Sequence, residues 1–236
     1  MIEIRNLSKK FNKMPVLKDL NLTLEAGKIS AILGPNASGK TTLLKCILGL
    51  IKPDSGQIYI NNQSLDGHWD YRRMIGYMPQ FAKFPENLSP REVIHFVERL
   101  RGNPDETDLE LYDNFQIINE LNKPFRTLSG GTKQKVSAIL AFLFYPEILI
   151  LDEPTAGLDP ISSQYLKKKI EKEKLNGKTI ILTSHIMSEV EEIADNIIFL
   201  VEGNIYFEGA INRILENFNE KRLESAIAKM MLDTRQ

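Results

Sequence analysis

The stretch from Gly34 to Thr42 constrains the fold more than any other part of the chain. It matches G-x-x-x-x-G-K-[ST], the pattern of a phosphate-binding loop. Gly34 and Gly39 let the backbone curl so that successive N–H groups point at an anion. Lys40 adds a positive charge for the terminal phosphates, and the Thr41 hydroxyl can bind the Mg²⁺ that accompanies a nucleotide. The predicted phosphate contacts are Gly34, Pro35, Asn36, Ala37, Ser38, Gly39, Lys40, Thr41 and Thr42.

The residues on either side of this loop support the pattern. The apolar run 29–33 predicts a buried strand, and residues 42–50 predict a helix with leucines facing a core. That helix would present the positive end of its dipole to the same phosphates. An ordinary glycine-rich turn is the alternative, but the strand before the loop and the helix after it disfavour that interpretation.

Two acidic residues follow a second apolar run. Residues 148–151 predict a central parallel strand, and Asp152 and Glu153 stand at its carboxyl end, where open α/β sheets place ligands. Asp152 can hold Mg²⁺, while Glu153 can polarise an attacking water. A solvated acid pair is the alternative. By the same logic, His185 follows the predicted strand 179–183 and lies where strand ends meet the ligand.

The N-terminal region has the alternation of half-buried antiparallel strands. Apolar residues alternate with polar ones at 2–4 and again at 20–24. Between them, Phe11 lies in a polar segment that we expect to be a loop. It can stack on an adenine or serve as a simple hydrophobic anchor, and the residues alone leave both open.

The character of the chain changes after Gln80. Ser89-Pro90-Arg91-Glu92 is a capping box with proline at the first helical position, and residues 90–128 show no strong strand pattern. Leu128-Ser129-Gly130-Gly131-Thr132 then opens an amphipathic helix, whose N-terminus could bind a second anion. These features predict a helical insertion into an α/β core.

Composition limits the function classes. The chain has 236 residues and a net charge of −1, so no polyanionic partner such as nucleic acid is expected. Its single cysteine, Cys46, excludes an internal disulfide and fits a small core residue of a protein from a reducing compartment. The N-terminus does not read as a signal peptide, and the longest apolar run, 138–151, is too short to span a bilayer.

The order of these motifs resembles that of the nucleotide-binding subunits of ABC transporters, over nearly all of residues 1–210. The resemblance implies an α/β fold: a P-loop NTPase core of the RecA type, with an antiparallel β subdomain and an inserted α-helical subdomain. The core would comprise residues 1–80 and 146–210, the helical subdomain 81–145, and a C-terminal helical tail 211–236.

The resemblance also implies roles for individual residues. Phe11 would stack on adenine, and Gln80 would contact Mg²⁺ and the attacking water beside Glu153 and His185. Ser129, Gly130 and Gly131 would grip the ATP held by an opposite subunit, and Asp159 would couple the two sites. Two positions depart from the family pattern: Ala37 replaces a glycine, tolerable unless φ must be positive, and Thr132 replaces a glutamine.

The partners follow from the same resemblance. We expect an ATPase that forms a head-to-tail dimer of identical chains around two ATP with Mg²⁺. It would act on a separate transmembrane permease from the cytoplasmic face of the membrane. The chain is similar to small exporter-type subunits, among them the ATPase that supports maturation of nitrous-oxide reductase. The alternatives are a soluble ABC ATPase acting on ribosomes or DNA, and a regulatory ATP-binding module without turnover.

Overall fold

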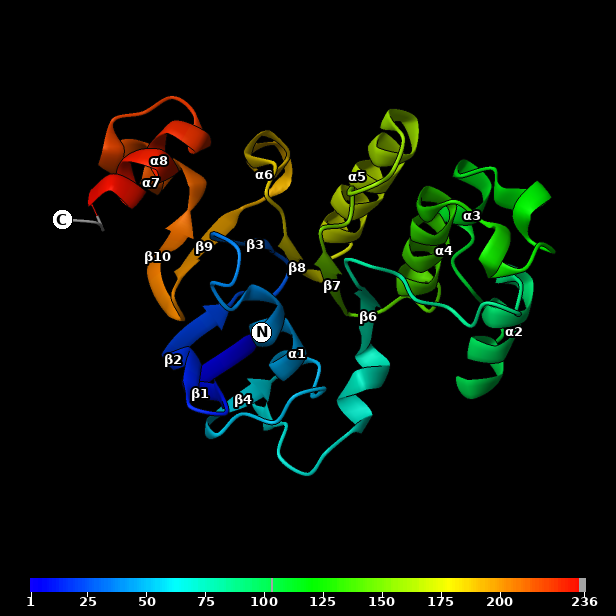
Figure 1. Cartoon of the computed structure of the whole chain (residues 1–236), viewed down its shortest axis with the longest axis horizontal. Coiled ribbons are helices and arrows are strands. Elements are labelled where there is room, and N and C mark those ends of the chain that lie inside the picture. The colour runs from blue at the N-terminus through cyan, green and yellow to red at the C-terminus, as the bar shows by residue number, and fades with distance from the viewer. Residues whose placement is uncertain (103, 234–236) are drawn as a thin grey trace. The chain divides into compact units, whose positions relative to one another are not determined.

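A computed structural model describes residues 1–102 and 104–233 (Figure 1). Residue 103 of the predicted insertion and residues 234–236 of the predicted tail lie outside this description. The chain packs into two compact units: unit 1 comprises Met1–Arg72 and Thr179–Gln236, and unit 2 comprises Arg73–Lys178. The subdomain boundaries expected at residues 80, 145 and 210 stay a prediction. Among the described residues, no helix combines the length and the hydropathy needed to cross a membrane.

Unit 1 contains a small antiparallel sheet with the strand order β2-β1-β4-β5. Its strands are β1 (Ile2–Phe11), β2 (Met14–Leu24), β4 (Ser55–Ile60) and β5 (Gln63–Ser64). Ile2, Ile4 and Leu22 are buried while their neighbours are more exposed, so the predicted alternation is confirmed. Phe11 is the last residue of β1 and pairs with Met14, so the expected loop around it is wrong.

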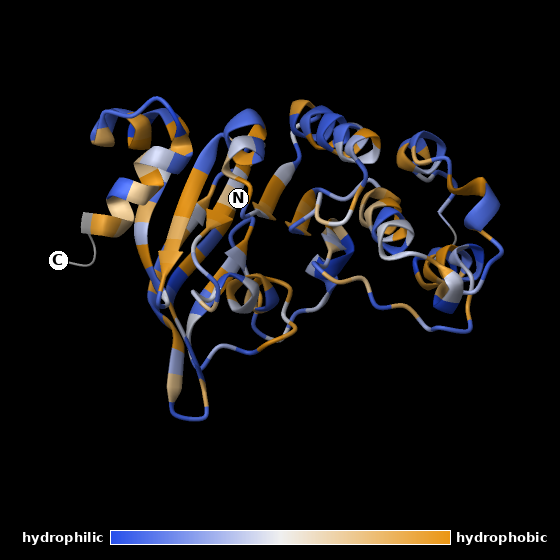
Figure 2. Ribbon diagram, turned by 45° about the horizontal axis from the view of Figure 1, so that its top comes forward, coloured by the Kyte–Doolittle hydropathy of each residue, from blue (hydrophilic) through white to orange (hydrophobic). Residues whose placement is uncertain are grey.

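A second sheet of unit 1 has the order β10-β9-β3-β8. It is built from β3 (Ile29–Leu33), β8 (Thr179–Thr183), β9 (Asn196–Val201) and β10 (Asn204–Ala210). β3 runs parallel to β8 and β9, and every residue of β3 and β8 is buried, as their continuous apolar sequences predict. In Figure 2 orange residues are concentrated in the strands of unit 1, whereas the connecting turns are mostly blue.

The helices of unit 1 are short. They are α1 (Lys40–Ile47), α6 (Met187–Ile193), α7 (Ile211–Phe218) and α8 (Leu223–Asp233). α1 begins directly after the phosphate loop, and its Leu43, Leu44 and Ile47 are fully buried. α7 packs on β10, and α8 packs on α7 and α6. The 3₁₀ helix η1 (Asp70–Met74) spans the sequence boundary between the two units, and the first strand of unit 2 begins directly after it at Ile75.

Unit 2 holds the parallel pair β6 (Ile75–Met78) and β7 (Ile148–Asp152), which are far apart in sequence. Its helices are α2 (Pro90–Leu100), α3 (Glu110–Asn114), η2 (Ile117–Glu120), η3 (Phe125–Thr127), α4 (Gly130–Phe142) and α5 (Pro160–Leu175). α4 packs on β6, where a side chain in place of Gly76 would collide with the Ala141 carbonyl. The helical residues 90–142 come between β6 and β7 in the sequence, although these two strands are neighbours in the sheet.

The predicted start of α2 is confirmed in atomic detail, and a second capped helix start lies at α5. Ser89 caps α2 by accepting the Glu92 N–H, and the Glu92 carboxylate accepts the Ser89 N–H at 2.8 Å. These hydrogen bonds lower the pKa of Glu92. Asp159 caps α5 by accepting the Ser162 N–H at 2.9 Å, with Pro160 at the first helical position.

A buried lysine joins α3 to α5 within unit 2. The Lys169 side chain is only 3% exposed, and its Nζ lies 2.5 Å from Asp108, 2.8 Å from Glu173 and 3.0 Å from Glu110. Burial opposes the charge, but these carboxylates outweigh it and raise the pKa of Lys169. The lysine therefore stays protonated, and each carboxylate keeps a compensating charge.

Candidate functional site

Three residues of the phosphate loop have positive φ angles. The φ angles are +147° at Gly34, +64° at Ala37 and +110° at Gly39. A side chain on Gly34 would collide with the Leu200 carbonyl, and one on Gly39 would come within 2.8 Å of Leu17. Ala37 therefore occupies a conformation that glycine adopts without strain, which is the condition under which its methyl group was expected to be unfavourable.

The β9–β10 turn holds this loop in place. The Gly203 N–H donates to the Ser38 carbonyl at 3.0 Å, while the Gly203 carbonyl accepts the Lys18 N–H at 2.9 Å. Residues 35–38 of the loop line a hollow of about 380 Å³ together with residues that include Tyr206 of β10 and Met231 of α8. The loop thus rests on backbone contacts from strands at both ends of the chain.

The N-terminus of α1 is suited to an anion. Within the described part of the chain, no side chain caps α1, and no acidic residue lies in its first turn. Its cap is Gly39, and Thr41 is exposed. Lys40 Nζ donates to the carbonyls of Gly34 at 2.7 Å and Pro35 at 3.0 Å, which holds the ammonium group at the loop. Ser38 is buried, and among the described residues its hydroxyl has no hydrogen-bond partner. These donors and this charge fit nucleotide phosphates.

Two further predicted residues belong to unit 1. The register of β3 against β8 pairs Ile32 with Thr183, so Gly34 and His185 both follow the same edge of that sheet. His185 is exposed there. Phe11 lies at the end of β1 with 46% of its surface exposed, and the Lys9 ammonium lies 5.6 Å from its ring centroid. An exposed aromatic face is available at Phe11.

Three predicted residues meet at one edge of the parallel pair in unit 2. β6 and β7 pair Met78 with Leu151, so Gln80 and Asp152 both lie at the carboxyl ends of these strands. Asp152 is 4% exposed, and burial followed by the Asp152 charge raises the pKa of Tyr77. Glu153 is half-buried and has φ +52°, a strained conformation of the kind that recurs at functional sites.

The other predicted group of unit 2 comprises residues 128–132, which we call the signature segment, and the loop before α5. Ser129 caps α4 and is exposed with Gly130. The Thr132 N–H donates to Ser129 Oγ at 3.1 Å, and the two hydroxyls lie 2.9 Å apart. Thr132, which replaces the glutamine of the family pattern, therefore interacts directly with the predicted phosphate-gripping hydroxyl. The predicted residues are thus divided between the units: a first set (the phosphate loop, Phe11 and His185) belongs to unit 1, and a second set (Gln80, Asp152, Glu153, Ser129, Gly130, Gly131 and Asp159) belongs to unit 2.

Sequence reasoning missed one residue of the second set. Lys135 of α4 forms an ion pair with Asp159, with 2.8 Å between Nζ and Oδ2. Lys135 and Ser162 together lower the pKa of Asp159 far below its usual range. No local pattern marks Lys135, because its partner is distant in the sequence. A lysine on the surface of a predicted helix carries no signal of its own.

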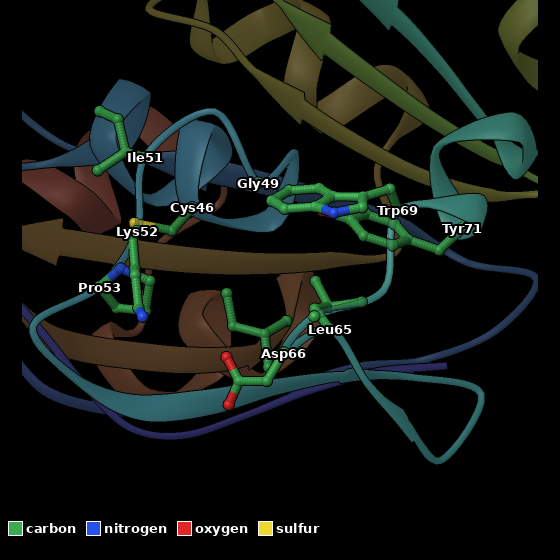
Figure 3. A pocket seen from close by; sticks show the side chains of 11 residues that line it. Cys46, Gly49, Ile51, Lys52, Pro53, Leu65, Asp66, Trp69 and Tyr71 are labelled. Carbon is green, nitrogen blue, oxygen red and sulfur yellow. The ribbon is translucent and has the colours of Figure 1, made fainter.

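A separate cavity of about 280 Å³ lies in unit 1. Figure 3 shows Trp69 and Tyr71 on one side of it and Asp66 on another, with Cys46 of α1 and Lys52 also in its wall. Burial is the main cause that raises the pKa of Cys46 to about 11. No residue of the phosphate loop is among the described residues that line this cavity.

Comparison with known proteins places this geometry in a family. The sequence pattern of the family described as ABC transporter matches residues 17–156. The chain is 37% identical over 210 residues to the lantibiotic transport ATP-binding protein SrtF of Streptococcus pyogenes, covering 88% of this chain and 90% of that protein. It is 32% identical over 221 residues to the Nod factor export ATP-binding protein I of Burkholderia lata, covering 92% and 73%.

A solved structure gives the same result. The ATP-binding cassette MJ0796, described as a dimer in a post-hydrolysis state bound to ADP and Pi, superposes with a TM-score of 0.79 and 25% identity. The match covers 89% of this chain and 98% of the cassette. The α/β P-loop NTPase fold is thereby confirmed.

The chain belongs to the ABC transporter family. It is an ATP-binding subunit that binds and hydrolyses ATP. Neither relative is named for nitrous-oxide reductase, so that finer resemblance stays a prediction.

Proposed function

We propose that this subunit powers an exporter as a head-to-tail dimer that encloses two ATP and drives a separate transmembrane subunit. The observation that carries the proposal is the N-terminus of α1. No side chain among the described residues caps it, the Lys40 ammonium lies beside it, and the loop before it contains three residues with positive φ. The direction of transport is supported by the Nod factor relative, whose name specifies export. The dimer is supported by the similar MJ0796 cassette, which is itself dimeric.

Each of the predicted residues would have its own role toward the nucleotide. The loop residues 34–42 hold the phosphates, Phe11 stacks on the adenine, and His185 contacts the γ-phosphate. Glu153 polarises the attacking water, because a carboxylate at the end of a buried strand can accept its proton. Thr41, Gln80 and Asp152 would hold Mg²⁺, which neutralises charge on the phosphate oxygens when bound.

The second chain would complete each site. Ser129, Gly130 and Gly131 at the N-terminus of α4 offer backbone N–H groups and a hydroxyl to the partner's γ-phosphate, and Asp159 connects this surface to the second ATP. ATP would therefore hold two chains together until it is hydrolysed. Thr132 tunes this contact, because its hydroxyl already shares a hydrogen bond with Ser129.

Nucleotide binding and turnover can be tested separately. Lys40→Ala should abolish most ATP affinity in calorimetry while circular dichroism shows a folded protein. Glu153→Gln keeps the shape of the side chain but removes its charge, so this variant should elute as a dimer in ATP during size-exclusion chromatography. Adding Ser129→Arg places bulk and charge at the partner's phosphate and should return the protein to a monomer. A dimer for both variants would contradict the composite site.

The membrane partner can be tested at Phe81. Phe81 is 73% exposed, whereas Phe84 stacks on Phe125 with ring centroids 4.2 Å apart, so Phe81 rather than Phe84 offers an apolar surface to a partner. Coexpressed with the membrane subunit encoded by its host, the protein should sediment with membranes, and Phe81→Asp should release it.

Ile118→Asp is the matched control, because Ile118 is also apolar, 57% exposed and in unit 2. This variant should stay on the membrane. Copurification of the wild-type chain with ribosomes or DNA would instead favour the soluble ABC ATPase.

A further inference from the structure

Within unit 2, the loop 154–159 and the first turns of α4 meet at two points. At the first, a Cβ added to Gly131 would lie 2.8 Å from the Gly157 carbonyl oxygen, so the two backbones approach too closely for a side chain. At the second, Lys135 Nζ lies 2.8 Å from Asp159 Oδ2. The loop is thus held against the helix that Ser129 begins.

Lys135 reaches Asp159 from a half-buried position. Its side chain is 19% exposed, and its ammonium lies 5.9 Å from the centroid of the Phe115 ring. A partly desolvated ammonium beside an aromatic ring has fewer competing water contacts than one on an open surface. The amine is therefore restricted in where it can lie, and Asp159 is its carboxylate partner.

The Asp159 carboxylate uses both oxygens at the start of α5. Oδ1 accepts the Ser162 N–H at 2.9 Å, and Oδ2 accepts the Ser162 hydroxyl at 2.7 Å as well as the Lys135 amine. One carboxylate thus caps α5 and joins it to α4. Without Lys135 the cap could persist, but the link to α4 would be lost.

We propose that Lys135 is a positioning residue, which fixes the loop 154–159 to the signature helix α4 so that Ser129 and Asp159 meet a second chain as one preassembled surface. The proposal rests on the dimer proposed above. ATP binding by a single chain uses Lys40 and its neighbours in unit 1. The loss of Lys135 should therefore weaken dimer formation without changing the ATP affinity of the monomer.

Three variants in the Glu153→Gln background test this role. Lys135→Met removes the charge and keeps an unbranched side chain beside Phe115, and Lys135→Arg keeps the charge. Lys133→Met removes the same charge from the same helix, where Lys133 is also half-buried. The ATP concentration for half-maximal dimer is measured by sedimentation velocity, and monomer ATP affinity by calorimetry at a protein concentration too low for dimers.

Partly exposed ion pairs are each worth roughly twofold to fivefold in an equilibrium constant, and the dimer contains two copies. Because two ATP join the dimer, the ATP concentration required changes as the square root of the combined effect, so Lys135→Met should raise it roughly twofold to fivefold with monomer affinity unchanged. Lys135→Arg should restore dimer formation, and Lys133→Met should match the parent. Equal dimer formation by Lys135→Met and the parent would overturn the proposal.

Hydrogen exchange separates this proposal from the proposed function. A parent that binds ATP but never forms a dimer, alone or with its membrane subunit, refutes the composite site. In that case, hydrogen exchange in the monomer still tests whether Lys135 positions the loop. The N–H groups of Ala156, Leu158 and Ser162 are hydrogen-bonded within or next to the loop, and Lys135→Met should speed their exchange relative to Lys133→Met. Equal exchange in both variants would refute the positioning role.

Discussion

Ala37→Gly should stabilise the protein, which is the reverse of the usual effect of placing glycine in a structured segment. Ala37 has φ +64° and an exposed side chain, so the substitution removes no packing and relieves only backbone strain. A left-handed alanine costs about 1–2 kcal/mol. Glycine gains about 0.4–1 kcal/mol of conformational entropy in the unfolded chain. The expected net gain in the free energy of unfolding is therefore about 0.5–1 kcal/mol.

The measurement is urea denaturation without nucleotide, followed by circular dichroism. Ala37→Ser is the matched control, because serine keeps a Cβ and therefore keeps the strain. Its unfolding free energy should stay within about 0.5 kcal/mol of the wild-type value, as for surface substitutions in general. In a thermal scan, Ala37→Gly should raise Tm by roughly 1–4 °C for a chain of this size.

A loss of stability in Ala37→Gly, or an equal gain in Ala37→Ser, would refute this reasoning. Either result would mean that residue 37 does not keep its left-handed conformation in solution. ATP affinity measured on the same samples then shows whether the strain serves binding. Unchanged affinity would mean that Ala37 is tolerated by the loop, without being required for phosphate binding.

Three further predictions concern stability and reactivity. Lys169→Met should destabilise the protein by about 3 kcal/mol or more in urea denaturation, because it leaves the buried Asp108 and Glu173 carboxylates without their cation. Ser89→Ala should cost about 1 kcal/mol through loss of the α2 cap, and Ser89→Asp should recover most of it. Cys46 should react with iodoacetamide at pH 8 roughly a hundredfold more slowly in the folded protein than in urea, because its pKa is raised from 9.0 to about 11. Since the folded thiol holds its proton to higher pH than the unfolded one, stability should fall as the pH rises from 9 to 11.

Each of these has a contradicting result. A Lys169→Met variant as stable as the wild type would show that the buried carboxylates become protonated at little cost in free energy. A Ser89→Ala variant with the unfolding free energy of the wild type would show that water replaces the cap. Equal alkylation rates in the folded and unfolded states would show that Cys46 is open to solvent despite its buried position.

Local patterns were sufficient for much of the fold. Continuous apolar runs predicted β3, β7 and β8, because strands buried on both faces need no polar alternation. The start of α2 was predicted from Ser89 and Glu92, since a capping box is a contact between residues three apart. The motif residues of the phosphate loop were likewise recognisable without any tertiary information.

Tertiary contacts decided the features that were missed. Nothing in the sequence around Phe84 indicates that its ring stacks on Phe125, which is distant in the chain. The positive φ of Ala37 depends on the chain that surrounds the loop, and Lys135 depends on a loop more than twenty residues away.

The contacts that hold the phosphate loop also set the order in which it can be completed during synthesis. Ser38 is made early, yet its carbonyl is bonded by Gly203, and the Ile29 N–H donates to the Asp195 carboxylate 166 residues later. A ribosome must therefore release most of the chain before the loop has its supports. Loops closed over such long separations form slowly. A nascent chain that ends before β9 would lack them, so acquisition of nucleotide binding would mark the completion of the whole subunit.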